Sequence, residues 1–213
     1  MGEQLFEKDF TPQCPHLAWL VEHLDGWQFG EQGLVLAIFD ELGLVGRSVE
    51  YGAGDGECLP LTIDRIYARV PVLSVLVEID DDRRERLKTC YPGAEICKTI
   101  NWATSSLLIN DVSVVVIDID GHDSVVMREM FDAGVRPALL VVEHFDRHYP
   151  IATSFPDPIP QWMLGIKLES GHAIQDTAET LHAIAGKFGY ERIGYNRCNS
   201  FFVRRELFTR LFR

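Results

Sequence analysis

The fold of this chain is decided by one stretch, Ser48-Val49-Glu50-Tyr51-Gly52-Ala53-Gly54-Asp55-Gly56-Glu57. A short strand is expected to run to Glu50 and to enter a turn with glycines at alternate positions, and the apolar-rich segment from Leu59 to Val70 then continues as a helix. Glycine suits such a turn because it tolerates positive φ and lets a ligand approach with no Cβ in the way. The stretch predicts a strand, loop and helix unit of the kind that holds nucleotides, although a glycine-rich turn without a ligand gives the same pattern.

The charge of this loop narrows the choice of ligand. The dinucleotide fingerprint G-x-G-x-x-G would place its third glycine at position 57, where this chain has Glu57. The loop is G-x-G-x-G instead, and it carries acids at Glu50, Asp55 and Glu57. Such acids repel a pyrophosphate but suit a ligand with cationic and hydroxyl groups, such as S-adenosylmethionine with its sulfonium, ammonium and ribose.

The composition is that of a soluble globular protein with an acidic balance. A length of 213 residues suits one domain of ordinary size, and 46% hydrophobic residues are enough for a proper core. The 32 acidic residues outnumber the 20 basic ones, for a formal net charge of −12, which argues against a nucleic-acid partner.

The cysteines and the N-terminus indicate a cytoplasmic protein. The five cysteines are scattered without CxxC spacing, so neither a disulfide framework nor a cysteine zinc site is expected. Residues 1–15 lack the basic start and apolar core of a secretory signal, and no apolar run reaches the roughly 20 residues that span a bilayer. No membrane partner is therefore expected.

Apolar runs and turn signals predict the remaining elements. Further strands are expected at 72–77, 94–100, 112–117, 137–142, 190–195 and 200–204, and helices at 16–24, 34–42, 81–90, 124–133 and 171–186. Strands that alternate with helices and close in a hairpin predict an α/β fold: a Rossmann-like, doubly wound, mostly parallel seven-stranded sheet with a C-terminal antiparallel hairpin.

Two segments flank or interrupt this pattern. Residues 1–47 are expected to form an N-terminal helical cap on the main domain, residues 48–213. The segment 145–164 is rich in proline and aromatic residues directly after a strand, which suits either a substrate wall or lid or an ordered connection.

Candidate ligand residues follow the strands, at the edge where open α/β sheets hold ligands. Glu78 ends the second strand, where its two oxygens can accept from both hydroxyls of a ribose, while Asp80 is the alternative or only the cap of the next helix. Asn101 and Trp102 follow the third strand, where an adenine could be met by an amide and an aromatic ring.

A second group of polar residues follows the strand at 112–117: Asp118, Asp120, His122 and Asp123. Glu143 and His144 end the next strand and add to the same edge. Such groups can bind a divalent metal, orient a sulfonium or act as a general base. The competing interpretation is that Asp123 caps the following helix and Asp120 braces the turn.

Together these residues resemble a class I S-adenosylmethionine-dependent methyltransferase, and more narrowly the FkbM-like group. The matching segments span about residues 48–205 in the family's order: Val49–Gly56, Val77-Glu78, Ile117-Asp118-Ile119-Asp120-Gly121-His122-Asp123, Val142-Glu143-His144 and Asn199-Ser200-Phe201-Phe202-Val203-Arg204. The resemblance implies that Gly52, Gly54 and Gly56 hold the methionine part, Glu78 the ribose, and Asp118 and Asp120 lie beside the methyl donor. Glu50 and Asn101 complete the expected cofactor-binding set.

The favoured hypothesis is O-methylation of a small hydroxylated molecule, a sugar or a natural product. Methyl transfer from a sulfonium is an in-line displacement, so alignment supplies much of the catalysis. The acceptor proton would go to His144 or His122, with Asp118 as a further catalytic candidate. A divalent cation such as Mg²⁺ on Asp118, Asp120 and Glu143 would instead lower the acceptor's pKa.

Two other functions stay open at this point. The chain could bind S-adenosylmethionine or a nucleotide without transfer, as a regulatory or partner protein, because no motif identifies a base. A nicotinamide-dependent oxidoreductase is disfavoured by Glu57 in the third glycine slot. The aromatic residues hint at a homo-oligomer without specifying one.

Overall fold

The computed structural model describes residues 8–26, 29–56, 61–102, 112–119, 121, 123–144 and 176–213. Glu57, Asp120 and His122 lie outside the described residues, as does the proline-rich segment 145–164.

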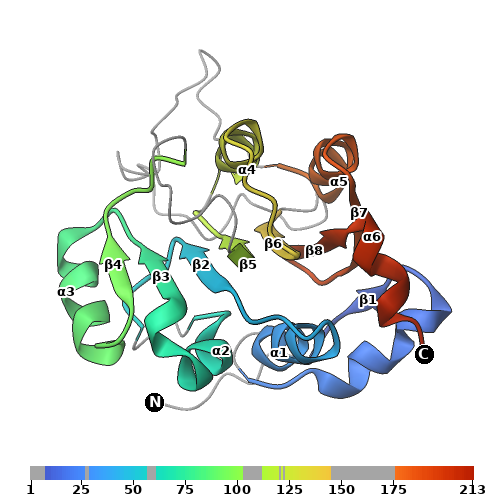
Figure 1. Ribbon diagram of the computed structural model, residues 1–213, viewed down its shortest axis with the longest axis horizontal. Helices are drawn as coiled ribbons and strands as arrows, with labels where there is room; N and C mark the ends of the chain where they lie inside the picture. Colours follow the sequence, from blue (N-terminus) through green and yellow to red (C-terminus); the bar gives the residue numbers. More distant parts are fainter. Residues whose placement is uncertain are drawn as a thin grey trace, which may run out of the picture.

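One mixed sheet forms the middle layer, with the strand order β1-β7-β8-β6-β5-β2-β3-β4 (Figure 1). The strands are β1 Thr11–Pro12, β2 Arg47–Tyr51, β3 Ser74–Val77, β4 Glu95–Cys97, β5 Val112–Ile117, β6 Leu139–Glu143, β7 Tyr190–Tyr195 and β8 Asn199–Arg204. Strands β2 to β6 pair in parallel, while β8 pairs antiparallel with both β6 and β7. The predicted fold class, a mostly parallel doubly wound sheet that ends in an antiparallel hairpin, is confirmed.

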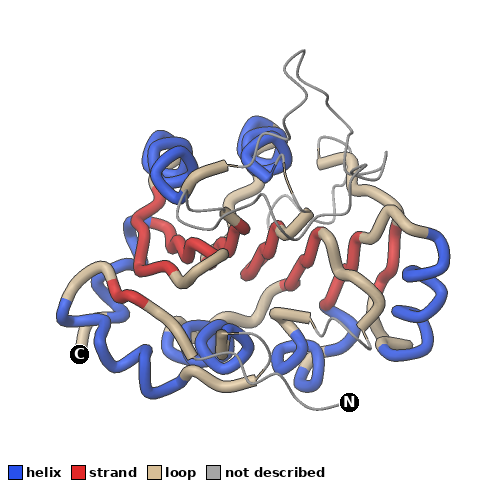
Figure 2. Tube along the Cα trace, turned by 180° about the vertical axis from the view of Figure 1, so that it is seen from behind, coloured by secondary structure: helices blue, strands red, loops and turns tan. Residues whose placement is uncertain are grey.

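Helices cover both faces of the sheet, so the molecule has three layers (Figures 1 and 2). One face carries η1 Pro15–His23, α1 Glu31–Glu41, α2 Asp64–Arg69 and α3 Asp81–Cys90, together with the C-terminal α6 Arg205–Phe208 and η4 Thr209–Leu211. The other face carries α4 Asp123–Asp132 and α5 Ala178–Lys187. Among the helices of the described part of the chain, none has the length and apolar character needed to cross a membrane.

The central strands are buried on both faces, which explains their continuous apolar runs. Alternate residues of one strand enter different clusters: Val114 packs toward α1 and its neighbour Val115 toward α4. Phe201 and Phe202 of β8 divide in the same way, and both are fully buried. The face to which a residue belongs therefore follows from its place in the strand alternation.

The chain before β2 packs into the same core as the sheet. Leu17 and Leu20 of η1 are fully buried in one cluster with Phe201. Thr11 and Pro12 add a two-residue strand to the edge of the sheet by pairing with Tyr195 and Gly194. The division into a cap at 1–47 and a main domain at 48–213 stays a prediction.

The number of strands and the extent of several elements differ from the prediction. In the described part of the chain the sheet has eight strands instead of seven, because β1 is too short to show any periodicity in sequence. Strand β3 begins at Ser74, since Pro71 opens a 3₁₀ turn, η2 Pro71–Leu73, that takes up the start of the apolar run. Strand β4 is three residues long, and the helix after the glycine loop is described only from Asp64 to Arg69.

Candidate functional site

The carboxyl ends of the strands place five residues at one level across the sheet. The last ladder partners of the parallel strands are Tyr51 with Val77, Tyr51 with Ile117, and Ile117 with Val142. The next residue of each strand therefore lies at the same level, and Glu143 pairs directly with β8. We call this set the edge row: Glu78, Gly52, Asp118, Glu143 and Asn199.

The glycine loop begins in this row, against the backbone of β5. Gly52 has a φ of 77° and donates its N–H to the carbonyl oxygen of Val77 at 2.9 Å. A Cβ at this position would lie 1.5 Å from the carbonyl oxygen of Asp118, which no side chain could accommodate. Gly56 also has positive φ, and a Cβ there would meet the ring of Tyr91 at 2.5 Å. Glycine is thus required at both positions by close packing as well as by conformation.

Glu78 supports the loop from the neighbouring strand. Its Oε2 accepts a hydrogen bond from Gly54 N–H at 3.0 Å, and its Oε1 accepts one from Asp80 N–H at 2.9 Å. The side chain is buried, with Arg83 at 3.9 Å from Oε2. Each carboxylate oxygen can accept more than one bond, so acceptor capacity is left for a ribose. Asp80 is the cap of α3, since its Oδ1 accepts from Arg83 N–H at 2.9 Å.

Glu50 is buried beneath the segment that follows the loop. Its two oxygens accept hydrogen bonds from Thr62 N–H at 2.9 Å and from Ile63 N–H at 3.0 Å. Burial raises the pKa of Glu50 to about 7, although these two bonds act in the opposite direction. Glu50 thus braces the segment that follows the glycine loop. A contact between Glu50 and a cofactor stays a prediction.

The turn after β5 separates the roles of its aspartates. Asp123, the first residue of α4, accepts hydrogen bonds from Ile119 N–H and Gly121 N–H, both at 3.1 Å. Asp123 therefore braces the turn, and burial raises its pKa to about 7. Asp118 is half-buried in the edge row and donates its N–H to the carbonyl oxygen of Tyr51 at 3.0 Å.

His144 follows Glu143 and is held against β8. Its N–H donates to the carbonyl oxygen of Cys198 at 2.6 Å, and its Nδ1 lies 3.2 Å from Ser200 Oγ. The residue is only 1% exposed. These contacts orient the imidazole at the same edge as Glu143, and its role as a base stays a prediction.

The two residues predicted to contact an adenine, Asn101 and Trp102, differ in their exposure to solvent. Trp102 is buried and stacks on Tyr51, with ring centroids 5.5 Å apart. The hydroxyl of Tyr51 lies 3.2 Å from both the N and the O of Ile100, which holds the end of this segment. Asn101 is exposed beside them. Trp102 therefore contributes to packing, and a contact between Asn101 and an adenine stays a prediction.

Three residues at this edge were missed by sequence reasoning: Glu31, Asn196 and Asn199. Glu31 opens α1 and is buried, and its Oε1 accepts from Asn196 Nδ2 at 2.5 Å and from Asn199 Nδ2 at 2.7 Å. Asn196 Oδ1 in turn accepts from Cys198 N–H at 3.0 Å and Asn199 N–H at 2.6 Å, which closes the β7–β8 turn. Two asparagines that flank a predicted hairpin turn are the one signal that could have indicated this cluster.

The metal hypothesis receives no added support from the described residues. Among them, no three histidine, cysteine, aspartate or glutamate side chains come together as a metal site. Asp120, one of the three expected ligands, lies outside those residues. A magnesium site on Asp118, Asp120 and Glu143 stays a prediction.

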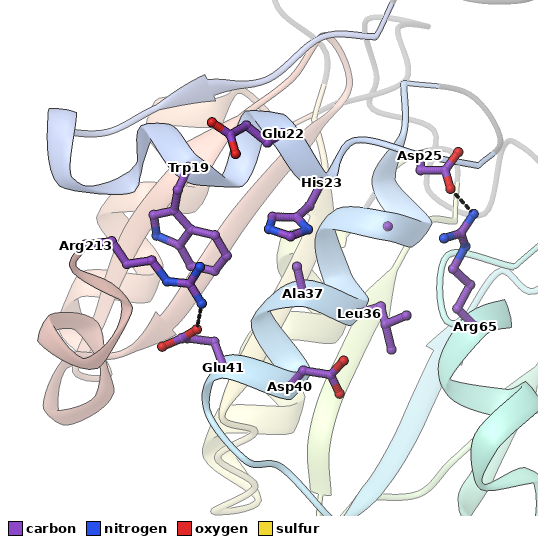
Figure 3. Close-up of a pocket in the computed structure, with 11 residues that line it drawn as sticks. Trp19, Glu22, His23, Asp25, Leu36, Ala37, Asp40, Glu41, Arg65 and Arg213 are labelled. Carbon is purple, nitrogen blue, oxygen red and sulfur yellow. Dashed lines mark hydrogen bonds and ion pairs between the residues drawn. The ribbon is translucent and has the colours of Figure 1, made fainter.

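A separate pocket of about 450 Å³ lies on the outer side of α1 (Figure 3). Its walls come from η1, α1 and α2, and from Arg213. Three of its carboxylates are already paired with arginines: Asp25 with Arg65, Asp40 with Arg69, and Glu41 with Arg213. We assign this pocket to the packing of the helical layer, because three of its four carboxylates are paired with arginines and the edge row lies elsewhere.

Comparison with known proteins identifies the fold. No protein-family model and no curated protein matches the sequence. The sugar N-methyltransferase KedS8 from Streptoalloteichus sp. ATCC 53650 superposes with a TM-score of 0.52 at 14% identity, over 96% of this chain and 98% of that one. CalS10, an amino pentose methyltransferase from Micromonospora echinaspora solved with bound S-adenosylmethionine, gives a TM-score of 0.52 at 13% identity, over 84% and 92%.

The citrinin polyketide synthase CMeT domain gives a TM-score of 0.53 at 13% identity. The match covers 83% of this chain and 51% of that one. At such identities the likeness shows the fold alone: the chain has the Rossmann-like fold of class I methyltransferases. Membership of the FkbM-like group stays a prediction.

The close approach of Gly52 to Asp118 predicts a specific cost for a side chain. Gly52→Ala should lower the free energy of unfolding by about 1–3 kcal/mol more than Gly43→Ala. Gly43 is the matched control, since it has a φ of 62° and nothing within 4 Å of an added Cβ. Urea unfolding of both variants measures the difference, and equal losses would show that only backbone conformation matters at Gly52.

The raised pKa of Glu50 predicts a pH dependence of stability. Below about pH 4.5 the carboxyl is protonated in both states, whereas between about 4.5 and 7 only the folded state keeps the proton. Folding stability contributed by Glu50 is therefore lost as pH rises toward 7. Relative to wild type, Glu50→Gln should gain up to about 3 kcal/mol across this range, since one pKa unit corresponds to about 1.4 kcal/mol.

Urea unfolding from pH 4.5 to 8 measures this difference. Glu85→Gln, at an exposed position on α3, is the control for general charge effects. Parallel stability curves for wild type and Glu50→Gln would contradict the prediction.

Proposed function

We propose that the chain is an S-adenosylmethionine-dependent methyltransferase that methylates a hydroxyl group of a small molecule, a sugar or a natural product. The observation that carries the proposal is the edge row, in which carboxylates at the ends of β3, β5 and β6 lie on both sides of the glycine loop that follows β2, at the carboxyl edge of the sheet. This is the place where open α/β sheets bind ligands, and the strand order reverses there between β2 and β5.

The residues present fit the donor in position and in charge. The missing Cβ of Gly52 lets the glycine loop turn directly over the carbonyl group of Asp118, which keeps the loop at the carboxyl edge of the sheet. Glu78 has acceptor capacity for a ribose, and Asp118 lies one strand beyond Gly52, where its carboxylate favours a cationic methionine part. Bound S-adenosylmethionine supplies a methyl group on a positively charged sulfur, which is transferred by in-line displacement.

The acceptor proton is assigned to His144. Its Nδ1 lies against Ser200 Oγ, so Nε2 is the nitrogen that takes the proton from the acceptor hydroxyl. Glu143, the preceding residue, ends β6 in the edge row. Two of the structural neighbours act on sugars or amino pentoses according to their names, which supports a small-molecule acceptor.

Calorimetry with S-adenosylmethionine and S-adenosylhomocysteine tests the donor site. Wild type should bind with a micromolar Kd, and Glu78→Ala should bind about 10- to 100-fold more weakly, because a hydrogen bond to a charged group is worth about 1.5–3 kcal/mol. Glu78→Gln, which keeps one acceptor oxygen, should lie between them. Asp82→Ala, on the exposed side of α3, is the control, and thermal unfolding checks that each variant is folded.

The same titrations with and without magnesium test the predicted cation.

Absence of donor binding by folded wild type would overturn the proposed function. Donor binding without turnover on any hydroxylated acceptor would favour a non-catalytic S-adenosylmethionine-binding protein.

Substitution of His144 tests the base. Once an acceptor is found, His144→Ala should lower kcat by about 10²- to 10⁴-fold and remove the acidic limb of the pH–rate profile, with donor affinity unchanged. His23→Ala, at an exposed position on η1, is the matched control. Full turnover by His144→Ala would exclude it as the base.

A further inference from the structure

The end of the edge row opposite Glu78 has a polar cluster of its own. Glu143 of β6 and Asn199 of β8 are direct ladder partners, so their side chains lie on the same face of the sheet. Asn199 Nδ2 donates to Glu31 Oε1 at 2.7 Å, which ties this pair to the start of α1. One amide therefore stands between two carboxylates.

The orientation of the Asn199 amide is determined by Glu31. Asn199 Nδ2 donates to Glu31 Oε1, which also accepts from Asn196 Nδ2, so the nitrogen of the Asn199 amide faces Glu31 and its oxygen faces away. Asn199 is 2% exposed, and among the described residues nothing donates to its Oδ1. Buried polar atoms are rarely left without a partner, so this oxygen indicates a missing hydrogen-bond donor.

Asn196, the other asparagine that donates to Glu31, differs from Asn199 in the partners of its amide oxygen. Asn196 also donates to Glu31, but its Oδ1 accepts two backbone N–H groups of the turn. The need to close the turn thus explains Asn196 completely. It does not explain the oxygen of Asn199.

The surroundings of Asn199 favour a positively charged hydrogen-bond donor. The hydrogen bonds that lower the pKa of Glu31 come from two neutral amides, and burial outweighs them and raises it. The half-buried thiol of Cys198, next to Asn199 in the chain, experiences the negative charges of Glu31, Asp118, Glu143 and Asp9. An ammonium group offers three donors and no acceptor, and it carries the charge that this environment attracts.

The cluster lies too far from Glu78 to serve the ribose. Four strand spacings separate β3 from β8, which at about 4.8 Å each amounts to about 19 Å. A donor with its ribose at Glu78 and its methionine part on the glycine loop reaches Asp118. Glu143 and Asn199 are then on the acceptor side.

We propose that the acceptor carries a protonated amino group beside its reacting hydroxyl, as an amino alcohol or amino sugar does, and that Asn199 Oδ1 and the Glu143 carboxylate bind this amine. Glu31 is a positioning residue that orients the Asn199 amide. The inference rests on the proposed function, because it takes the acceptor side from the placement of the donor.

Paired acceptors test the inference: amino sugars and amino alcohols, each with the analogue that has hydrogen or hydroxyl in place of the amine. Wild type should favour the amine by at least about 100-fold in kcat/KM. Glu143→Gln and Asn199→Ser should each reduce this preference by about 10-fold or more, mainly through KM. Glu31→Gln should reduce it less, because its amide still has an acceptor oxygen for Asn199 Nδ2.

Controls separate this inference from the proposed function. Glu179→Gln, at an exposed position on α5, should keep the full preference. Calorimetry with S-adenosylhomocysteine should give wild-type affinity for all four variants, which also shows that they are folded. Donor binding with equal kcat/KM for both members of each pair would overturn the amine site and leave the methyltransferase intact. A preference that survives in both Glu143→Gln and Asn199→Ser would place amine recognition elsewhere, and absence of donor binding would overturn the proposed function itself.

Discussion

The contact between the backbone of Gly52 and the carbonyl oxygen of Asp118 is the constraint on which the candidate site depends. It joins β2 and β5, the two strands between which the order of the sheet reverses. Because no Cβ fits between them, the loop after β2 can leave the sheet at once and turn over its carboxyl edge. The carboxylates on either side of this contact are then held at one level, from Glu78 to Glu143.

Buried carboxylates stabilise this arrangement, although their removal from water is itself unfavourable. Glu78 and Glu50 use their oxygens to accept backbone N–H groups of the loop and of the segment after it, so the loop conformation is determined by side chains beneath and beside it. Removal of these carboxylates from water is unfavourable, as the raised pKa of Glu50 shows. On the proposed function, binding of a cationic donor at this edge would offset part of that cost.

Much of the sheet could be predicted from the sequence, because strands buried on both faces appear as continuous apolar runs that end in polar residues. Glu78, Asp118 and Glu143 were found for this reason. The start of β3 was predicted wrongly because Pro71 opens a 3₁₀ turn within the apolar run. The contact of Glu31 with Asn199 could not be predicted, since 168 residues separate them and only the antiparallel return of β8 brings them together. The structural role of Asp123, one of the two interpretations left open by the sequence, also needed the structure, which shows its carboxylate hydrogen-bonded to its own turn.

Strand β1 has a consequence for how copies of the chain could associate. It covers β7 with only two residues, and Pro12 has no N–H to donate to a further strand. At the opposite edge β4 is three residues long and carries the exposed, charged Glu95. Short edges of this kind discourage pairing between the sheets of neighbouring molecules. Both edges of the sheet are therefore poor templates for a continuous sheet between molecules, because each offers few backbone groups to a further strand.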